Sequence, residues 1–515
     1  MTGAVTSHRR GCPPVLALAA VLAWVVVLIT VCDLTGRFDN HPGTRPAQGK
    51  VAVHTAADSG DWRLGSVGPA HAIEGYADRV SARPGEVFRL FVSTTAPSFT
   101  VAAYRMGWYG GRQAHLVWHS PRLLGRVQAA PRRIPGLNTV TTAWQPSAMV
   151  ATRGWPEGDY LLKLVSSAGF GRYIPLTIRS TSARGKVVLV NAVTTWQAYN
   201  TWGDYSLYTG PKGFADRARA VSFDRPYDGS GADQFFAYEQ PLVALAEKMG
   251  LPLAYATDIE LATKPQLFQG ARAVIFLGHD EYWSSTMRTN ATRIRDAGTN
   301  LAFLGANEIY RHIRLEPTAL GADRLVVCYK SAAEDPSYST DPHETTQSWR
   351  YPPFPQPENV LTGTYYQCNP ATAPLVIYDP KAWMFAGTGV RRDSVFPGLV
   401  GSEYDRVVAD PTTPHPIQVL SHSPITCRGQ ADYADAAYYS VASGAGVFAT
   451  GTLNWVCALG TGCGKDGPDQ AGRAFVTRVT ENVLQVFSHG PAGRTYPARD
   501  NTAAVGVRAN IDYPS

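Results

Sequence analysis

The sequence predicts a mixed α/β protein with three parts: an N-terminal transmembrane anchor, a β-sandwich and a doubly wound parallel-sheet domain. Three observations predict this fold class. Residues 13–32 form an uncharged apolar run. Short alternating strands separated by turn residues follow up to about residue 183. Continuous apolar runs then alternate with helical patterns, which is typical of a parallel sheet. With 515 residues the chain is long enough for two or three domains.

The apolar run near the N-terminus is predicted to cross a membrane. Twenty residues in a helix rise about 30 Å, which matches the hydrocarbon core of a bilayer. His8, Arg9 and Arg10 precede the run, so the chain that follows it is expected on the outer side. We interpret residues 1–35 as a cytoplasmic stub and an uncleaved signal anchor, because no small-x-small cleavage site follows. The alternative is a cleaved signal and a secreted protein.

Composition agrees with a location outside the cytoplasm. Five of the seven cysteines lie beyond the anchor without C-x-x-C spacing, which favours disulfides and leaves at least one thiol unpaired. These cysteines are Cys328, Cys368, Cys427, Cys457 and Cys463. The formal charge is only +6 and no dense basic run suggests a nucleic-acid groove, so nucleic acid is excluded as a partner.

The predicted sandwich spans residues 71–183, after a flexible linker over residues 36–70 that is rich in Gly, Pro and Ala. Phe88, Leu90 and Val92 alternate after a Pro-Gly turn. Two further apolar strands are predicted over residues 160–165 and 173–178.

The predicted parallel-sheet domain spans residues 184–490 and leaves 491–515 as a tail. Buried strands are predicted over 186–190, 273–277, 301–304 and 447–450. Helices are predicted over 240–249, which has Pro241 at its start, and over 284–297, which has Ser284 as N-cap. The apolar face from Phe475 to Val486 predicts a closing helix. The elements between residues 310 and 445 have no predicted order.

Polar and aromatic residues cluster where three of these strands end. In an open parallel sheet, ligands bind beyond the carboxyl ends of the strands. The first strand runs into residues 191–202, the second into 278–283 and the third into 305–308. His279 and Glu281 lie two residues apart just before a helix, so both are expected in one crevice. A helix-cap role for these two, a turn role for Asn307 and simple packing for Tyr199 and Trp202 are the structural alternatives.

Several common catalytic motifs are absent from the sequence. There is no G-x-x-x-x-G-K-[ST] phosphate loop, no G-x-S-x-G elbow and no H-E-x-x-H helix. The residues alone therefore indicate an exported α/β protein with a carboxylate–imidazole site.

Four short motifs in combination resemble the large (beta) subunit of N,N-dimethylformamidase and its actinobacterial relatives. They are Thr-Trp-Gln-Ala-Tyr-Asn at 195–200, Arg-Pro-Tyr at 225–227, Gly-His-Asp-Glu-Tyr-Trp at 278–283 and Gly-Ala-Asn-Glu at 305–308. Residues 104–111 and 158–160 also resemble the sandwich of this family. The resemblance covers roughly residues 70 to 490. It implies an immunoglobulin-like sandwich and a second domain similar to glutamine-amidotransferase-like or flavodoxin-like folds.

The resemblance also implies an amidohydrolase with one ferric ion held by two tyrosines and a glutamate. The matching residues are Tyr199, Tyr227 and Glu281, with Tyr205 and Tyr208 as competitors for the tyrosine positions. Phenolate and carboxylate oxygens suit a hard trivalent iron. His279, Asn307, Lys330 and Glu403 match the catalytic pocket of the family, with His279 or Glu403 as general base and Asn307 and Lys330 at the oxyanion. Trp196, Trp202 and Trp283 are expected to contact the substrate.

Two further hypotheses about function agree with the sequence. One is a non-catalytic cell-envelope protein that binds glycan or another surface component through the aromatic cleft. The weaker one is an exported hydrolase of glycans or peptides that uses carboxylates without metal. The enzyme of this family also works with a small partner subunit, whereas this chain is expected to be membrane-anchored, so its substrate is expected to differ.

Overall fold

The computed structural model describes residues 61–511. Over these residues the protein is a mixed α/β structure with several sheets, which confirms the predicted class. No helix within the described residues is long and apolar enough to span a bilayer. The predicted anchor and most of the linker lie outside the described residues.

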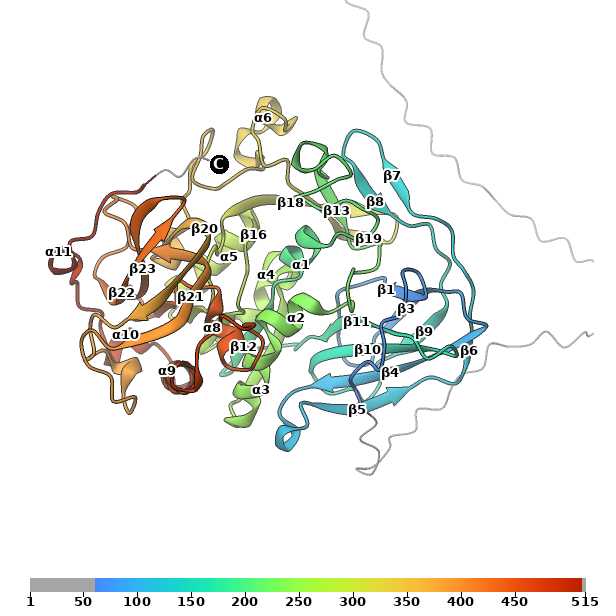
Figure 1. The fold of residues 1–515 in the computed structure, drawn as a ribbon, viewed down its shortest axis with the longest axis horizontal. Coiled ribbons are helices and arrows are strands. Elements are labelled where there is room, and N and C mark those ends of the chain that lie inside the picture. Colours follow the sequence, from blue (N-terminus) through green and yellow to red (C-terminus); the bar gives the residue numbers. More distant parts are fainter. Residues whose placement is uncertain (1–60, 512–515) are drawn as a thin grey trace, which may run out of the picture. The chain divides into compact units, whose positions relative to one another are not determined.

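Residues 73–178 form two principal sheets and a small hairpin (Figure 1). The first sheet has the order β1-β3-β9, and the second has β2-β11-β10-β4-β5 with β6 paired to β4. Their bounds are β1 Ile73–Ala77, β2 Ser81–Ala82, β3 Val87–Thr94, β4 Ser98–Met106, β5 Ala114–His119, β6 Leu123–Leu124, β9 Ala148–Ala151, β10 Gly158–Ser166 and β11 Gly171–Ile178. The hairpin pairs β7 (Arg132–Ile134) with β8 (Thr139–Thr141). The three strands predicted here are confirmed as β3, β10 and β11.

A seven-stranded sheet with the order β14-β12-β15-β17-β24-β23-β22 organises the rest of the chain. The first five strands run parallel, β23 pairs antiparallel with β24, and β22 pairs antiparallel with β23. Their bounds are β12 Val187–Asn191, β14 Leu253–Thr257, β15 Ala273–Phe276, β17 Asn300–Phe303, β22 Ile417–Cys427, β23 Gln430–Ser440 and β24 Gly446–Ala449. The four predicted strands are confirmed as β12, β15, β17 and β24. Strand β14 was not predicted, because its apolar run is short and has no Val or Ile.

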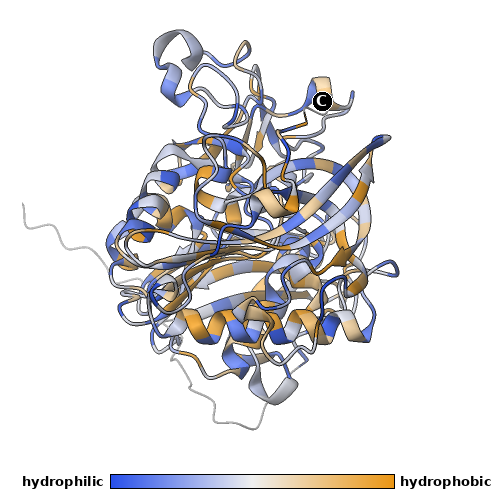
Figure 2. Ribbon diagram, turned by 90° about the vertical axis from the view of Figure 1, so that its left-hand side faces the viewer, coloured by the Kyte–Doolittle hydropathy of each residue, from blue (hydrophilic) through white to orange (hydrophobic). Residues whose placement is uncertain are grey.

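Helices cover both faces of this sheet. Val188 and Val190 of β12 pack in one core cluster with Ile259 of α4 and Met287 of α5. Val187 and Leu189 face the other side, in a cluster with residues of α3 and α9. The main helices are α1 Val193–Tyr199, α2 Asp233–Tyr238, α3 Gln240–Lys248, α4 Asp258–Thr263, α5 Ser285–Asp296, α8 Asn454–Ala458 and α9 Gln470–Ser488. Figure 2 shows hydrophobic residues in the inner strands and alternating with hydrophilic ones along the helices.

The predicted helix boundaries agree closely with these helices. Pro241 lies in the first turn of α3, where its missing N–H costs no helical hydrogen bond. Ser284 caps α5, with its hydroxyl accepting from the Met287 N–H. Four short helices complete the set: α6 Ser337–Thr340, α7 Asn359–Thr362, α10 Ala492–Thr495 and α11 Thr502–Val505.

Two additional sheets accompany the parallel sheet. One has the order β13-β19-β18-β16, and the other pairs β20 with β21. Their bounds are β13 Ala220–Ser222, β16 Tyr282–Ser284, β18 Arg311–Thr318, β19 Gly321–Val327, β20 Tyr365–Val376 and β21 Val395–Arg406. These strands lie largely in the stretch whose order the sequence did not predict.

Four cysteines form disulfides in the structure, as expected for an oxidising compartment. Cys368 pairs with Cys427, and Cys457 pairs with Cys463. Cys328 is a buried free thiol. The prediction of disulfides with one cysteine left over is confirmed for the described residues.

Candidate active site

The site is built where β12 and β15 end. Helix α1 follows β12 and carries Tyr199 in its last turn. The hydroxyl of Thr195 in α1 accepts hydrogen bonds from the backbone N–H groups of Glu281 and Tyr282. This contact fixes the loop after β15 against α1. It brings Glu281 within reach of Tyr199.

A buried arginine shapes the loop that carries Tyr208. The guanidinium of Arg225 donates to the backbone carbonyls of Asn200, Trp202 and Tyr205. Arg225 is 1% exposed, and burial lowers its pKa to about 10. Because these carbonyls fold residues 200–208 back toward α1, the ring of Tyr208 stacks on that of Tyr199 with the centroids 4.6 Å apart.

Three acidic oxygen groups converge at this point. The phenol of Tyr199 donates to Oε2 of Glu281 at 2.8 Å, and the phenol of Tyr208 donates to Oε1 at 2.8 Å and lies 2.9 Å from Oε2. The two phenolic oxygens are 3.0 Å apart. Burial, reinforced by the charge of Glu281, raises the pKa values of both tyrosines well above their usual range.

This donor set fits a hard cation. Oxygen ligands of the phenolate and carboxylate type suit a small, highly charged metal ion. Burial beside the Glu281 carboxylate disfavours the ionised forms of the two phenols unless a positive charge compensates them. No cluster of three His, Cys, Asp or Glu side chains suited to a metal occurs between residues 61 and 511. The candidate set is therefore distinguished by its two phenols.

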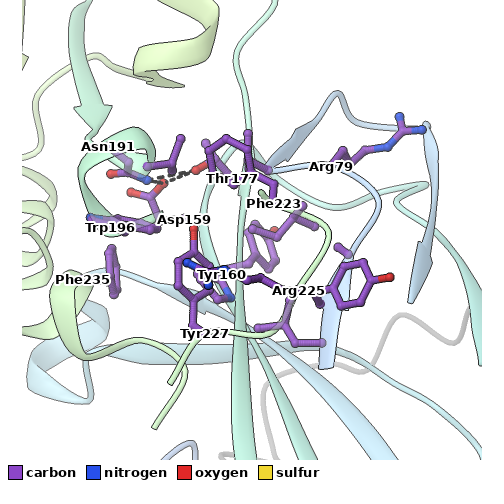
Figure 3. Close-up of a pocket in the computed structure, with 17 residues that line it drawn as sticks. Arg79, Asp159, Tyr160, Thr177, Asn191, Trp196, Phe223, Arg225, Tyr227 and Phe235 are labelled. Carbon is purple, nitrogen blue, oxygen red and sulfur yellow. Dashed lines mark hydrogen bonds between the residues drawn. The ribbon is translucent and has the colours of Figure 1, made fainter. Parts of the chain in front are cut away.

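The structure brings together a set that differs in one member from the set expected from sequence. Tyr208 takes the position beside Glu281 that was assigned to Tyr227. Figure 3 shows Tyr227 in a different group, among the residues that line a cavity of about 30 Å³ with Asp159 and Arg225. Its phenol lies near the Gln197 side chain, and burial raises its pKa. Tyr205, the other competitor, packs against Trp202 and its neighbours at the edge of the sandwich.

His279 and Glu403 lie next to the three oxygens. The His279 Nε2 atom is 3.3 Å from the phenol of Tyr199 and 3.7 Å from Glu281 Oε2. Its Nδ1 atom is 3.3 Å from the carbonyl of Ala306, which favours a proton on Nδ1. Burial raises the pKa of Glu403; the His279 ring opposes this shift and the Glu281 charge adds to it. Oε1 of Glu403 accepts from the amide of Asn369 at 2.9 Å.

A layer of buried carboxylates holds the loops that carry these residues. Asn307 has φ of 60°, and its N–H donates to Asp405 at 2.8 Å. The N–H of Asp280 donates to Glu308 at 2.9 Å. Burial raises the pKa values of Asp280 and Asp405 to about 7. The sequence did not identify Asp405 or Asn369, because neither lies in a recognisable motif.

Lys330 lies beside the site and contacts two tyrosines, whereas it was expected at the oxyanion. Its ammonium donates to the phenol of Tyr282 and lies 3.4 Å from the ring centroid of Tyr208. Burial, with the nearby charge of Arg311, lowers its pKa well below the usual range. Arg311 itself approaches Oε1 of Glu281 at 3.5 Å. The two basic groups thus border the cluster on the side of Tyr208 and Glu281.

The three tryptophans expected at the substrate have different surroundings. Trp283 is fully buried against Phe276 and Phe303, and Trp202 packs on Trp144 in the sandwich. These two are packing residues, so the expectation for them is corrected. Trp196 lines a cavity of about 160 Å³ together with Tyr199, Asn200, Tyr227 and residues 228 and 231–235. At about 30 Å³ for a water molecule, this cavity admits only a small ligand.

Comparison with known proteins adds one family match. The model of the family described as N,N-dimethylformamidase beta subunit-like, C-terminal, matches residues 100–468. A search of curated proteins gave no match. Among solved structures, a Paenibacillus sp. cycloisomaltooligosaccharide glucanotransferase in complex with cycloisomaltoheptaose is 11% identical, with a TM-score of 0.14. The match covers 41% of this chain and 20% of that enzyme, and at this level it supports no argument about fold or function.

Proposed function

Because the chain belongs to the N,N-dimethylformamidase beta subunit-like family, we propose that it is a metal-dependent hydrolase of a non-peptide C–N amide bond. We propose further that it acts outside the cytoplasm, tethered by the predicted anchor. The observation that carries the proposal is the convergence of Tyr199, Tyr208 and Glu281 on one buried point.

Ferric iron is the proposed cofactor, held by the phenolates of Tyr199 and Tyr208 and the carboxylate of Glu281. Three protein ligands leave positions for water and a substrate carbonyl. When bound, such an ion supplies Lewis acidity: it polarises a carbonyl and lowers the pKa of a bound water. The tyrosine protons must leave when the metal binds, so its affinity rises with pH.

His279 and Glu403 are proposed to move the protons of the reaction. With a proton on Nδ1, the His279 ring directs the lone pair of Nε2 toward the cluster, where it accepts a proton from water. Oε2 of Glu403 is buried without a close hydrogen-bond partner within residues 61–511, the Asn307 side chain acts on the same carboxylate, and this oxygen is proposed to receive the proton. Its raised pKa suits transfer to the amine that leaves.

Asn307 is proposed to orient the amide carbonyl through its side chain, which the left-handed backbone and Asp405 hold in place. Lys330 is proposed to act on Tyr208 and Tyr282. Its side-chain nitrogen donates to the phenol of Tyr282 and lies over the ring of Tyr208. The cavity beside Trp196 and Tyr199 is the proposed position for a small amide substrate.

The metal content and colour of the purified full chain test the proposal. Tyrosinate bound to ferric iron gives a visible charge-transfer absorption. We expect this absorption together with one iron per chain, and amine release from N,N-dimethylformamide or another small N-substituted amide. A colourless chain that takes up no iron after reconstitution contradicts the metal site. A coloured chain that hydrolyses no amide in a broad panel contradicts the reaction.

We also propose how the chain divides into domains. We assign residues 71–183 to an immunoglobulin-like sandwich and 184–490 to a doubly wound domain. The sheet order β14-β12-β15-β17-β24 is 2-1-3-4-5 in chain order, which supports a flavodoxin-like arrangement.

A further inference from the structure

One long stretch of the sandwich contains no acidic residue. Between Glu86 and Glu157, residues 87–156 include many arginines and no Asp or Glu. The segment has eight arginines and no lysine, so its net charge of +8 exceeds the +6 of the whole chain. A local excess of this kind attracts anionic partners, although the net charge of the chain is small.

Exposed apolar side chains lie within the same stretch. Leu124 is 89% exposed, Met149 73% and Val127 69%. Side chains of this size seldom remain so exposed in a group unless the surface has a function. Arg122 and Arg126 are exposed beside them in sequence. We call Arg122, Leu124, Arg126, Val127 and Met149 the basic–apolar strip.

The members of the strip lie on neighbouring segments. The Arg126 guanidinium donates to the carbonyls of Gln145 and Pro146, just before β9, which carries Met149. The Gln128 amide donates to Gln145 as well. In the view of Figure 1, β6 and β9 lie on the same side of the sandwich, and the β7–β8 hairpin lies above them. That hairpin adds Arg132, Arg133 and Ile134, all exposed.

The positive charges of the strip are uncompensated. Within residues 61–511, none of Arg122, Arg126, Arg132 and Arg133 takes part in an ion pair. The acidic groups of the adjoining sheet are already used, because Asp78 pairs with Arg79 and Arg89, and Glu86 with Arg79, Arg83 and Arg179. Strand β9 is also an unpaired sheet edge among the strands of residues 61–511.

We propose that the basic–apolar strip docks the sandwich on an anionic phospholipid surface. Arginines bind phosphate headgroups, while Leu124, Val127 and Met149 enter the boundary between headgroups and acyl chains. Charge complementarity and the protruding apolar side chains favour a lipid surface over an acidic protein, which would leave these side chains without an apolar partner. Docking would hold the protein against the membrane independently of the active-site chemistry.

A polarity-sensitive fluorophore on the strip tests this proposal. The full chain carries Met149→Cys labelled with NBD, in a background of Cys12→Ser and Cys32→Ser, and is studied with nanodiscs. We expect brighter, blue-shifted emission with phosphatidylglycerol-containing nanodiscs but not with pure phosphatidylcholine. The same label at Val395→Cys, an exposed apolar position on β21, is expected to show no difference.

Charge reversal gives the matched comparison. Each unit of charge near an anionic surface contributes roughly a fivefold change in affinity, and each reversal changes the charge by two units. Arg122→Glu with Arg132→Glu is therefore expected to lower the ratio of docked to free protein roughly 600-fold. Arg391→Glu with Arg499→Glu changes the charge equally elsewhere and is expected to have no effect. Emission that is indifferent to lipid charge overturns the proposal. A response to soluble polyglutamate in place of anionic nanodiscs also overturns it, since the strip would then bind acidic polypeptide.

Discussion

Two buried carboxylates at the carboxyl edge of the same parallel sheet have opposite surroundings. Asp159 of β10 meets Asn191 at the end of β12 and accepts from its amide at 2.6 Å and from the hydroxyl of Thr177 at 3.1 Å (Figure 3). Glu281, after β15, meets two phenols. The first carboxylate is surrounded by neutral donors, whereas the second lies among other acids.

The difference separates a structural role from a functional one. Neutral donors hold Oδ1 of Asp159, while its Oδ2 is buried without a hydrogen-bond partner among the described residues, and these contacts join the sandwich to the sheet. Three acidic groups at one point gain stability from positive charge. Arg311, 3.5 Å from Glu281, and Lys330, over the ring of Tyr208, supply part of that charge, and a bound metal ion would supply the rest. Burial with a raised pKa is therefore insufficient to identify a site. The composition of the surrounding groups carries the functional information.

The largest effect is expected from removing the carboxylate that the proposed metal needs. Glu281→Gln should lose the iron and the visible absorption, and lower activity by more than about 100-fold, beyond the loss typical of an outer partner. Its matched control, Asp159→Asn, makes the same carboxyl-to-amide change and should keep both iron and activity. Metal analysis and circular dichroism of the two variants check this. If Glu281→Gln binds iron normally, the contrast between the two carboxylates fails.

The two tyrosine assignments separate in the next experiment. Tyr208→Phe removes a phenol that touches Glu281, so the charge-transfer absorption should disappear or shift strongly. Tyr227→Phe changes a phenol near Gln197 and should leave the absorption unchanged. Visible spectra of the iron-reconstituted variants decide the matter. The opposite pattern would restore the assignment expected from sequence.

The raised pKa of the buried Asp159 carboxyl is expected to make the stability of the protein depend on pH. Burial raises the pKa of Asp159 to about 6 from an ordinary value of 3.8. The unfolded carboxyl therefore ionises first, and stability falls as pH rises from about 4 to about 6. Two pKa units correspond to about 3 kcal/mol. Asp159→Asn keeps the acceptor for Asn191 and should be more stable than the parent by up to that amount at about pH 7. Near pH 4 the two should be equal.

Urea unfolding of both chains at the two pH values measures this difference. If Asp159→Asn is more stable than the parent by the same amount at both pH values, the substitution improves packing and ionisation contributes nothing. The same measurements test the contrast between the two carboxylates. Asp159 should change stability without changing the iron, and Glu281 should do the reverse.

The sequence predicted the parallel strands and the placement of Glu281 and His279, because buried apolar runs and strand ends follow simple rules. It favoured Tyr227 and gave Tyr208 only as a competitor, since the position of Tyr208 depends on how Arg225 folds the loop over 200–208. It also left residues 310–445 unordered. The long strands β20–β23 there contain register shifts, which disrupt the alternation that identifies a strand.

The smallest effect is expected at Asn369, which the sequence did not indicate. Its amide donates to Glu403 and favours the ionised carboxylate, so Asn369→Ala should raise the pKa of Glu403. A hydrogen bond to a charged group contributes about 1.5 kcal/mol, or about one pKa unit. The acidic limb of the pH profile for kcat/KM should then move upward by up to that amount.

Gln367→Ala is the control for this shift. Gln367 lies on the same strand, and its amide donates to Asn510 at 2.9 Å, so removing it should leave the profile in place. If Asn369→Ala lowers activity equally at every pH, Asn369 only maintains the local structure. A shifted limb would instead mean that the acidic cluster extends to Glu403. The site would then differ from the Asp159 cluster in a second way, because its hydrogen bonds would set the pH range in which the protein is active.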